Sequence, residues 1–199
     1  MDNASRDRTA AVASDAGVRV VHEPVRGVGR ARNAGGRAAH GDVLVFVDAD
    51  TRVAPDLLER IAAAMAEPSC IGGAVDVAHR PRSAVLRAYL AGWRLLGRLF
   101  RMWQGAVQFC RRSAFDELGG YDERQWMGED VDFVWRLRRL ARRTDATVAL
   151  IEDVRVEPSP RRYDQWPVWR TLVFTNPVYV TLFARWRRAW SGWYDDPPR

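Results

Sequence analysis

The stretch that decides the fold is GRARNAGGRAAHGDVLVFVDADT, residues 29–51. Its centre, VLVFV at 43–47, places five consecutive apolar residues between a Gly-Asp turn signal and two acids. A short apolar run bounded in this way predicts a strand buried on both faces. The small residues at 30–39 predict a closely packed helix before it. We therefore expect a helix and then a strand whose carboxyl end carries Asp48 and Asp50.

The same alternation of helices and strands continues along the chain. Further strands are predicted at 18–21, 70–77, 105–110 and 147–151. Helices are predicted at 9–16, from Pro55 onward, and at 83–102, 113–118, 129–142 and 166–190, with a break at Pro177 and a frayed tail at 195–199. Strands that alternate with helices favour an α/β fold with a mostly parallel sheet and helices on both faces.

Composition indicates a globular α/β domain. The 199 residues are 47% apolar and 28% charged, and no tract approaches the ~18 uncharged apolar residues of a membrane span. The first fifteen residues are polar and include acids, which excludes a signal or transit peptide there and favours a cytoplasmic location. Cys70 and Cys110 lie in apolar stretches without metal-ligand spacing, so we expect two reduced, buried thiols.

The net charge is +6, and all 31 cationic side chains are arginines. Arginine suits phosphate and carboxylate ligands, although its exclusive use beside abundant alanine also fits a bias in base composition. A basic protein could bind nucleic acid. Against this alternative, 25 acids are interspersed, and the sequence has neither a long basic run nor a nucleic-acid-binding motif. We expect no nucleic-acid partner.

Asp48 and Asp50 form the first candidate site. Ligands of open α/β sheets bind beyond the carboxyl ends of the strands, which is where the 43–47 strand places these two acids. Two adjacent carboxylates are costly unless a cation joins them. Magnesium or manganese accepts such oxygen ligands together with substrate phosphates, and the cation can neutralise a diphosphate leaving group. The alternative is a solvated acidic turn before a helix.

Glu129 and Asp130 form the second candidate site, at the start of a predicted helix. A carboxylate within hydrogen-bond reach of an acceptor hydroxyl can remove its proton as the oxygen attacks. The positive end of the helix dipole favours ionised acids at this position. Taken alone, the pair could equally serve to cap the helix.

Residues 29–51 resemble the nucleotide-binding half of the family 2 glycosyltransferases, which have the GT-A fold. The family order is Arg-Asn-x-Gly, a small-residue helix, Gly-Asp or Gly-Glu, an apolar strand and D-x-D, and residues 32–50 follow it. The resemblance implies that Asp48 contacts the nucleotide ribose and the metal, and that Asp50 is the principal metal ligand. It also implies that Arg32 contacts the nucleotide or its phosphates.

Residues 105–139, GAVQFCRRSAFDELGGYDERQWMGEDVDFVWRLRR, resemble the acceptor half of the same family. The family pattern is an apolar strand, Arg-Arg, a short helix, Gly-Gly-Phe/Tyr-Asp-Glu, and Gly-Glu-Asp opening a helix. The resemblance implies that Asp130 is the catalytic base and that Glu129 orients the acceptor or shapes the site. It places residues 119–121 in the wall of the acceptor site.

The resemblance also includes residues before position 29 and after position 139. Asp2 matches a residue that helps to hold the nucleotide base, and the chain opens inside the turn that follows the family's second strand. A GT-A domain without its first strand and helix is therefore expected, with either a true start upstream or an inactive truncated fragment. Near the other end, Arg161 and Arg162 resemble a Ser-x-Arg-Arg stretch that would close over the diphosphate, with a solvated loop as the alternative.

Together these motifs predict a divalent-metal-dependent transfer from a nucleoside-diphosphate sugar to an acceptor hydroxyl, and the family resemblance implies that the transfer proceeds with inversion. Nucleotidyl transfer also uses paired acids, but it gives no reason for the second acidic segment. We expect a glycosyltransferase domain at 1–164 and a helical extension at 165–199. The helix at 83–102 and the stretch at 166–194 are rich in tryptophan and arginine, which favours either core packing or peripheral contact with an anionic membrane. Such contact at the inner face of the cell membrane would suit a lipid-linked or envelope acceptor.

Overall fold

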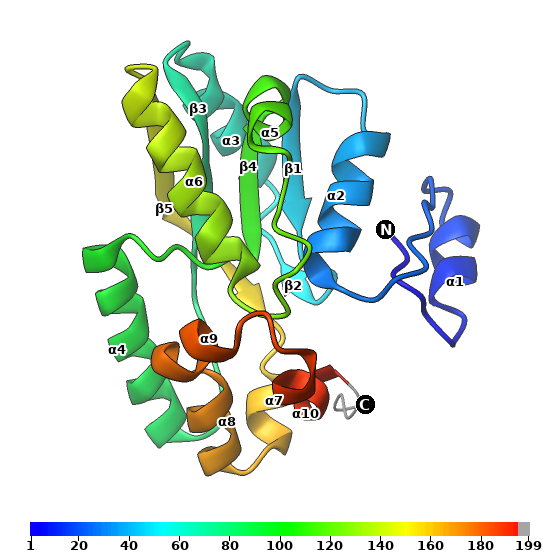
Figure 1. Ribbon diagram of the computed structural model, residues 1–199, viewed down its shortest axis with the longest axis vertical. Helices are drawn as coiled ribbons and strands as arrows, with labels where there is room; N and C mark the ends of the chain where they lie inside the picture. Colours follow the sequence, from blue (N-terminus) through cyan, green and yellow to red (C-terminus); the bar gives the residue numbers. More distant parts are fainter. Residues whose placement is uncertain (195–199) are drawn as a thin grey trace.

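A computed structural model describes residues 1–194 and shows a mixed α/β architecture around one five-stranded sheet (Figure 1). The strand order is β1-β4-β3-β5-β2. The strands are β1 (Val43–Val47), β2 (Thr51–Arg52), β3 (Cys70–Val77), β4 (Val107–Arg111) and β5 (Thr147–Pro158). The predicted fray at 195–199 lies outside the described residues.

The α/β class is confirmed, but the prediction of a mostly parallel sheet needs correction. Only β3 and β5 pair in parallel within the described sheet; β1 with β4, β3 with β4, and β2 with β5 all pair antiparallel. The reason is the position of α4 (Ala84–Phe100), which lies below the sheet instead of crossing one of its faces (Figure 1). After α4 the chain therefore re-enters the sheet at the same end at which β3 left it, so β4 runs antiparallel to β3.

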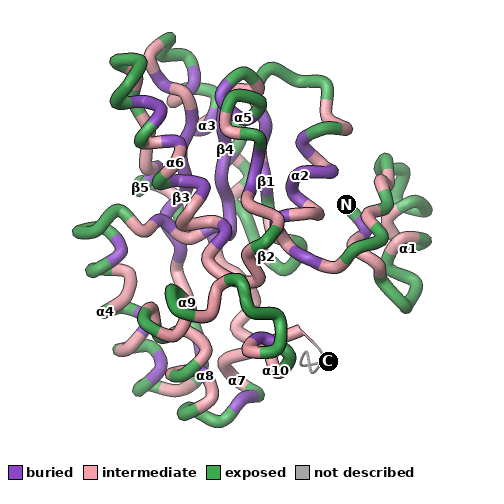
Figure 2. Tube along the Cα trace, viewed as in Figure 1, coloured by how far each residue is buried: buried purple, intermediate pink, exposed green. Residues whose placement is uncertain are grey.

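Helices cover both faces of the sheet, as the alternation predicts. On one face α3 (Leu57–Ala66) buries Leu57, Ile61 and Met65 against β3, β4 and β5. On the other face lie α2 (Val28–Ala38), α5 (Arg112–Leu118) and α6 (Glu129–Arg143). Figure 2 shows the burial concentrated along the central strands. Cys70 and Cys110 are both buried free thiols, as expected.

The remaining helices gather below the sheet, apart from α1 (Thr9–Asp15), which lies to one side (Figure 1). They are α7 (Arg161–Gln165), α8 (Val168–Phe174), α9 (Pro177–Phe183), the 3₁₀ helix η1 (Arg187–Trp190) and α10 (Ser191–Tyr194). The break predicted at Pro177 within the helical stretch 166–190 is confirmed, and this stretch has a further break between α9 and η1. Asn176 caps α9 by accepting hydrogen bonds from two backbone N–H groups, and Pro177 is its first residue, so a new helix starts there.

One strand prediction is wrong. Residues 18–21 form no strand; an isolated bridge joins Asp2 to His22 instead. The strand at 43–47 forms, and core clusters lie on both of its faces: Leu44 and Phe46 are buried on one side, and Val43 and Val45 pack partly buried on the other. Val47, the last residue of this edge strand of the described sheet, stays 47% exposed.

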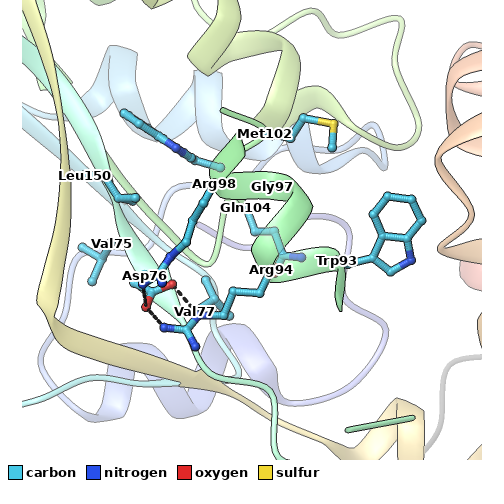
Figure 3. Close-up of a pocket in the computed structure, with 11 residues that line it drawn as sticks. Val75, Asp76, Val77, Trp93, Arg94, Gly97, Arg98, Met102, Gln104 and Leu150 are labelled. Atoms are coloured by element: carbon cyan, nitrogen blue, oxygen red, sulfur yellow. Dashed lines mark hydrogen bonds and ion pairs between the residues drawn. The ribbon is translucent and has the colours of Figure 1, made fainter. Parts of the chain in front are cut away.

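Ion pairs to a buried carboxylate attach α4 to the sheet. Asp76 of β3 is 5% exposed and accepts hydrogen bonds from Arg94 and Arg98 of α4 (Figure 3). Ser83 caps the helix by accepting a bond from the Leu86 N–H. In the described part of the chain, no helix is both long and apolar enough for a membrane crossing.

Candidate functional site

Arg32 on α2 joins the two predicted acidic sites. Its guanidinium Nη2 donates to Asp48 Oδ1 at 2.7 Å and to the Gly105 carbonyl at 3.0 Å. Its Nη1 donates to Glu129 Oε1 at 2.8 Å. The side chain is 8% exposed, and burial alone would lower the pKa of Arg32, but the charges of Glu129 and Asp48 raise it. Arg32 therefore stays charged and ties the end of β1 to the start of α6.

Glu129 is buried with this arginine. It is 6% exposed, and burial raises the pKa of Glu129 from 4.5 to about 7, although the charge of Arg32 acts in the opposite direction. The repulsion of Asp130 adds to the increase. Glu129 consequently titrates close to neutral pH, because the positive charge of Arg32 only partly offsets the cost of burying the ionised carboxylate.

Asp130 is held next to Arg32 by backbone bonds. Its Oδ2 accepts from the Gly105 N–H at 2.6 Å, and its Oδ1 accepts from the Val131 N–H at 2.8 Å. A Cβ at position 105 would lie 2.4 Å from Asp130 Cβ and 3.1 Å from Arg32 Nη2. The approach of the 105 backbone to Asp130 thus requires glycine. Each carboxylate oxygen still has a lone pair that can accept a further hydrogen bond.

Asp48 and Asp50 follow β1 at the end of the sheet that faces α7–α10. The side chain of Asp48 is 41% exposed; burial raises its pKa, Arg32 opposes this, and the charges of Asp130 and Asp50 raise it further. Asp50 is exposed, and its carbonyl accepts from the Ser159 N–H at 2.9 Å. The negative charge crowded at Asp48 fits a cation with oxygen ligands.

These two carboxylates supply an incomplete set of metal ligands. Within residues 1–194, no group of three histidine, cysteine, aspartate or glutamate side chains is arranged to hold an ion. A divalent cation at Asp48 and Asp50 would therefore take its other ligands from phosphate and water, which is the usual situation for magnesium at nucleotide sites.

Asn33, the neighbour of Arg32, links the two motifs of the sequence. Its Oδ1 accepts from the Tyr121 N–H at 2.7 Å, and its Nδ2 donates to the Tyr121 carbonyl at 3.0 Å. The Tyr121 ring is 2% exposed and stacks on Phe133 at 4.2 Å between centroids. Tyr121 is therefore a core residue behind the site, and its predicted place in the acceptor wall is wrong.

Three predicted nucleotide-contacting residues, Asp2, Arg161 and Arg162, differ in how they relate to the acidic cluster at Asp48 and Asp50. Asp2 is buried, but His22 Nδ1, 2.7 Å from its Oδ2, holds it in the N-terminal segment, and none of its recorded contacts within residues 1–194 reaches the acidic cluster. Arg161 is exposed. Arg162 lies 3.9 Å from the Trp193 ring centroid and donates to the Trp193 carbonyl, and Asp50 is close enough for its charge to raise the pKa of Arg162, which burial lowers.

Several neighbours of the site carry no sequence signal. Tyr194 donates to the Trp126 carbonyl at 2.6 Å, and burial raises its pKa beyond its ordinary range, with Glu129 adding to the shift. His79 Nε2 lies 2.7 Å from Gln104 Oε1, while its buried Nδ1 has no partner in the described residues. Burial lowers the pKa of His79, and Asp50 acts against this. Only the tertiary fold brings these residues together.

The model of the family "Glycosyl transferase family 2" matches residues 1–143. The chain belongs to glycosyl transferase family 2. A relative, the pre-mycofactocin glycosyltransferase of Mycobacterium tuberculosis (strain H37Rv), is 32% identical over 136 residues. The match covers 60% of this chain and 28% of that protein, so the chain spans well under half the length of the curated relative.

Solved structures of glycosyltransferases share the fold. The mannosyltransferase PcManGT of Pyrobaculum calidifontis, in complex with GDP-Man and Mn²⁺, aligns with a TM-score of 0.62 at 20% identity over 84% of this chain and 48% of that chain. Glucosyl-3-phosphoglycerate synthase of Mycobacterium tuberculosis, in complex with Mn²⁺, UDP and glucosyl-3-phosphoglycerate, aligns with a TM-score of 0.61 at 22% identity. This alignment covers 93% of this chain and 67% of that chain. The family 2 chain thus has the GT-A fold that its sequence predicts.

Proposed function

We propose that this chain forms the catalytic core of a glycosyltransferase that moves a sugar from a nucleoside-diphosphate sugar to an acceptor hydroxyl with inversion. The observation that carries the proposal is the convergence of the two acidic motifs on one arginine. Arg32 contacts Asp48 at 2.7 Å and Glu129 at 2.8 Å, although the two acids are far apart in sequence. Family membership, shown by the match over residues 1–143, supports the same conclusion.

In this proposal Asp130 is the general base. Gly105 and Val131 fix its carboxylate through backbone bonds, so the free lone pairs keep a constant direction. The carboxylate takes the proton of the acceptor hydroxyl as that oxygen attacks the anomeric carbon, and the bond from this carbon to the diphosphate oxygen breaks on the opposite face. Attack from the face opposite the leaving group gives inversion.

Asp48 and Asp50 hold the donor end. A divalent cation, Mg²⁺ or Mn²⁺, would neutralise the charge that grows on the departing diphosphate when it is bound there. The two solved relatives that carry Mn²⁺ with a nucleotide or nucleotide sugar support this expectation. Arg162, stacked on Trp193 and close enough to Asp50 to feel its charge, is our candidate for pairing with phosphate oxygens. Exposed Arg161, and Asp2 with its carboxylate 2.7 Å from His22, are weaker candidates for nucleotide contact.

The structure changes the role that we assign to Arg32. The sequence resemblance implies contact with the nucleotide, but two carboxylates and a carbonyl already accept its hydrogen bonds. We therefore propose that Arg32 is a positioning residue that keeps Asp48 and Glu129 at a fixed separation. The acceptor is proposed to be a lipid-linked or envelope glycan presented at the inner face of the membrane. Nucleic acid is not among the proposed partners.

Donor turnover tests the proposal directly. A panel of UDP-, GDP- and dTDP-sugars is incubated with the chain and Mn²⁺, and release of the nucleoside diphosphate is measured with and without EDTA. We expect metal-dependent release from one donor class, and a loss of at least ~100-fold for Asp130→Asn. Release by Asp130→Asn at the wild-type rate would remove the assignment of the base. A chain that turns over no donor under any condition would instead favour the inactive fragment.

A further inference from the structure

The outer face of α4 consists only of apolar residues. The positions recur at three- and four-residue spacing and therefore share one side of the helix. We call these exposed residues the α4 outer face: Ala84, Val85, Ala88, Ala91, Gly92, Leu95, Leu96 and Leu99. Leu95 is 69% exposed and Leu99 is 72% exposed. An exposed apolar stripe of this length on a folded domain indicates an interaction surface.

The opposite side of α4 is fixed to the protein, so the helix cannot turn to hide this stripe. Leu86, Leu90 and Gly97 are buried. Arg94 and Arg98 bind the buried carboxylate of Asp76 (Figure 3). Rotation of α4 would break these charge-assisted bonds and leave the buried Asp76 carboxylate with the longer contact to Arg155 of β5, at 3.4 Å, which is unfavourable. The outer face is thus held outward by the fold.

The C-terminal helices α8 and α9 lie at the same end of the molecule as α4 (Figure 1), and this part of the chain adds exposed apolar side chains. Trp169 on α8 is 65% exposed, Val178 and Leu182 on α9 are 65% and 71% exposed, and Trp186, just before η1, is 55% exposed. The hydroxyl groups of Tyr89 on α4 and Thr175 after α8 lie 3.1 Å apart, which connects this group to α4. The two tryptophans are notable because tryptophan favours the boundary between water and the lipid chains.

Charge decides between the occupants that could cover these helices. No aspartate or glutamate occurs from Ala78 to Phe115 or from Gln165 to Tyr194. Among the arginines of these two segments, five pair with acids from elsewhere in the chain: Arg80, Arg82, Arg94, Arg98 and Arg185. Arg111 and Arg112 bond to backbone carbonyls of residues 65–70 and 36–41. The exposed arginines that pair with no carboxylate of the described residues are Arg87, Arg101, Arg187 and Arg188. A second copy would bring the same acid-free, arginine-bearing segments against each other. An anionic lipid surface complements both the arginines and the apolar side chains.

We propose that the α4 outer face, together with the exposed apolar side chains of α8 and α9, lies in the interfacial region of an anionic lipid bilayer. This binding is independent of catalysis. Its consequence for the site rests on the proposed function: α9 adjoins the start of α6, since Val180 Cγ1 would lie 3.2 Å from a Cβ at Gly128 and the Trp126 N–H donates to the Ala184 carbonyl at 2.7 Å. Docking therefore brings Glu129 and Asp130 near the bilayer surface, where a lipid-anchored acceptor presents its hydroxyl.

Vesicle flotation tests the proposal with the complete chain. The vesicles contain phosphatidylglycerol and phosphatidylcholine, or phosphatidylcholine alone. We expect binding to the anionic vesicles that weakens with salt, and much less binding to the neutral ones. The double variant Leu95→Glu/Leu99→Glu should lose at least about tenfold in affinity, because it removes apolar burial and adds repulsion. Arg101→Gln, an exposed residue at the end of α4, should lose roughly fivefold on anionic vesicles.

The matched control is Leu58→Glu on α3, a leucine that is 65% exposed away from this surface and whose replacement should leave binding unchanged. Equal loss in both leucine variants, or no binding by the wild type, would overturn the proposal. A dimer in sedimentation equilibrium that Leu95→Glu/Leu99→Glu abolishes, without vesicle binding, would show that a second copy covers the face. Asp130→Asn should bind vesicles like the wild type, so a failure of the catalytic proposal can be told apart from a failure of the membrane-binding proposal.

Discussion

The replacement Glu129→Gln gives a quantitative test of the electrostatics of the site. Burial raises the pKa of Glu129 from 4.5 to about 7, so the folded chain holds this proton over a pH range in which the unfolded chain has released it. Stability from such a group is present below pH ~4.5 and is lost as the pH rises through ~7. A difference of about 2.5 pKa units corresponds to roughly 3 kcal/mol. Because Glu129 is only 6% exposed, solvent screening reduces this figure little.

Urea unfolding followed by tryptophan fluorescence at pH 4 to 8 measures the effect. The unfolding free energy of the wild type minus that of Glu129→Gln should fall by roughly 3 kcal/mol across this range. Subtraction removes the contributions of groups that titrate in both proteins. Glu59→Gln, at an exposed position on α3, is the matched control and should run parallel to the wild type. A flat difference curve for Glu129→Gln, or one that rises with pH, would refute the assignment of a buried, incompletely compensated carboxylate.

Three further predictions concern the same architecture. Arg32→Met should lower the unfolding free energy by about 3–5 kcal/mol in urea titrations, because it leaves Glu129 buried without its partner; an effect below 1 kcal/mol would show that the pair is solvated. Gly105→Ala should keep the fold by circular dichroism but reduce turnover ~100-fold, since the added methyl displaces Asp130; unchanged turnover would contradict this. Trp190→Ala should destabilise by about 3–5 kcal/mol, as its side chain is fully buried, whereas Trp186→Ala should cost under ~0.5 kcal/mol.

The sequence predicted those parts of the fold that depend on local pattern. Residues 84–100 and 129–143 form the expected helices, since their apolar spacing and terminal charges act within each segment. Strand direction was not predictable in this way. The reversal of β4 depends on where α4 packs, and that position depends on the buried contact between Asp76 and Arg94, which has no local signal.

In the candidate site, too, residues that belong to local motifs were predictable, whereas contacts that depend on tertiary packing were not. The motifs singled out Arg32, Asp48 and Glu129, and the structure brings all three together. The partner of Arg32 was not predictable, because an arginine beside phosphate-binding residues and an arginine between two carboxylates look alike in sequence. The same holds for Gly105, whose importance comes from backbone bonds to residues elsewhere in the chain.

The most direct test of the central claim separates the donor site from the base by measuring nucleotide binding. Titration calorimetry of UDP and GDP in the presence of Mn²⁺ compares the wild type with Asp50→Asn and Asp130→Asn. If the cation and diphosphate bind at Asp48 and Asp50 while Asp130 acts only on the acceptor, Asp50→Asn should weaken binding at least ~10-fold. Asp130→Asn should bind like the wild type. Unchanged binding by Asp50→Asn, or equal losses in both variants, would contradict the account.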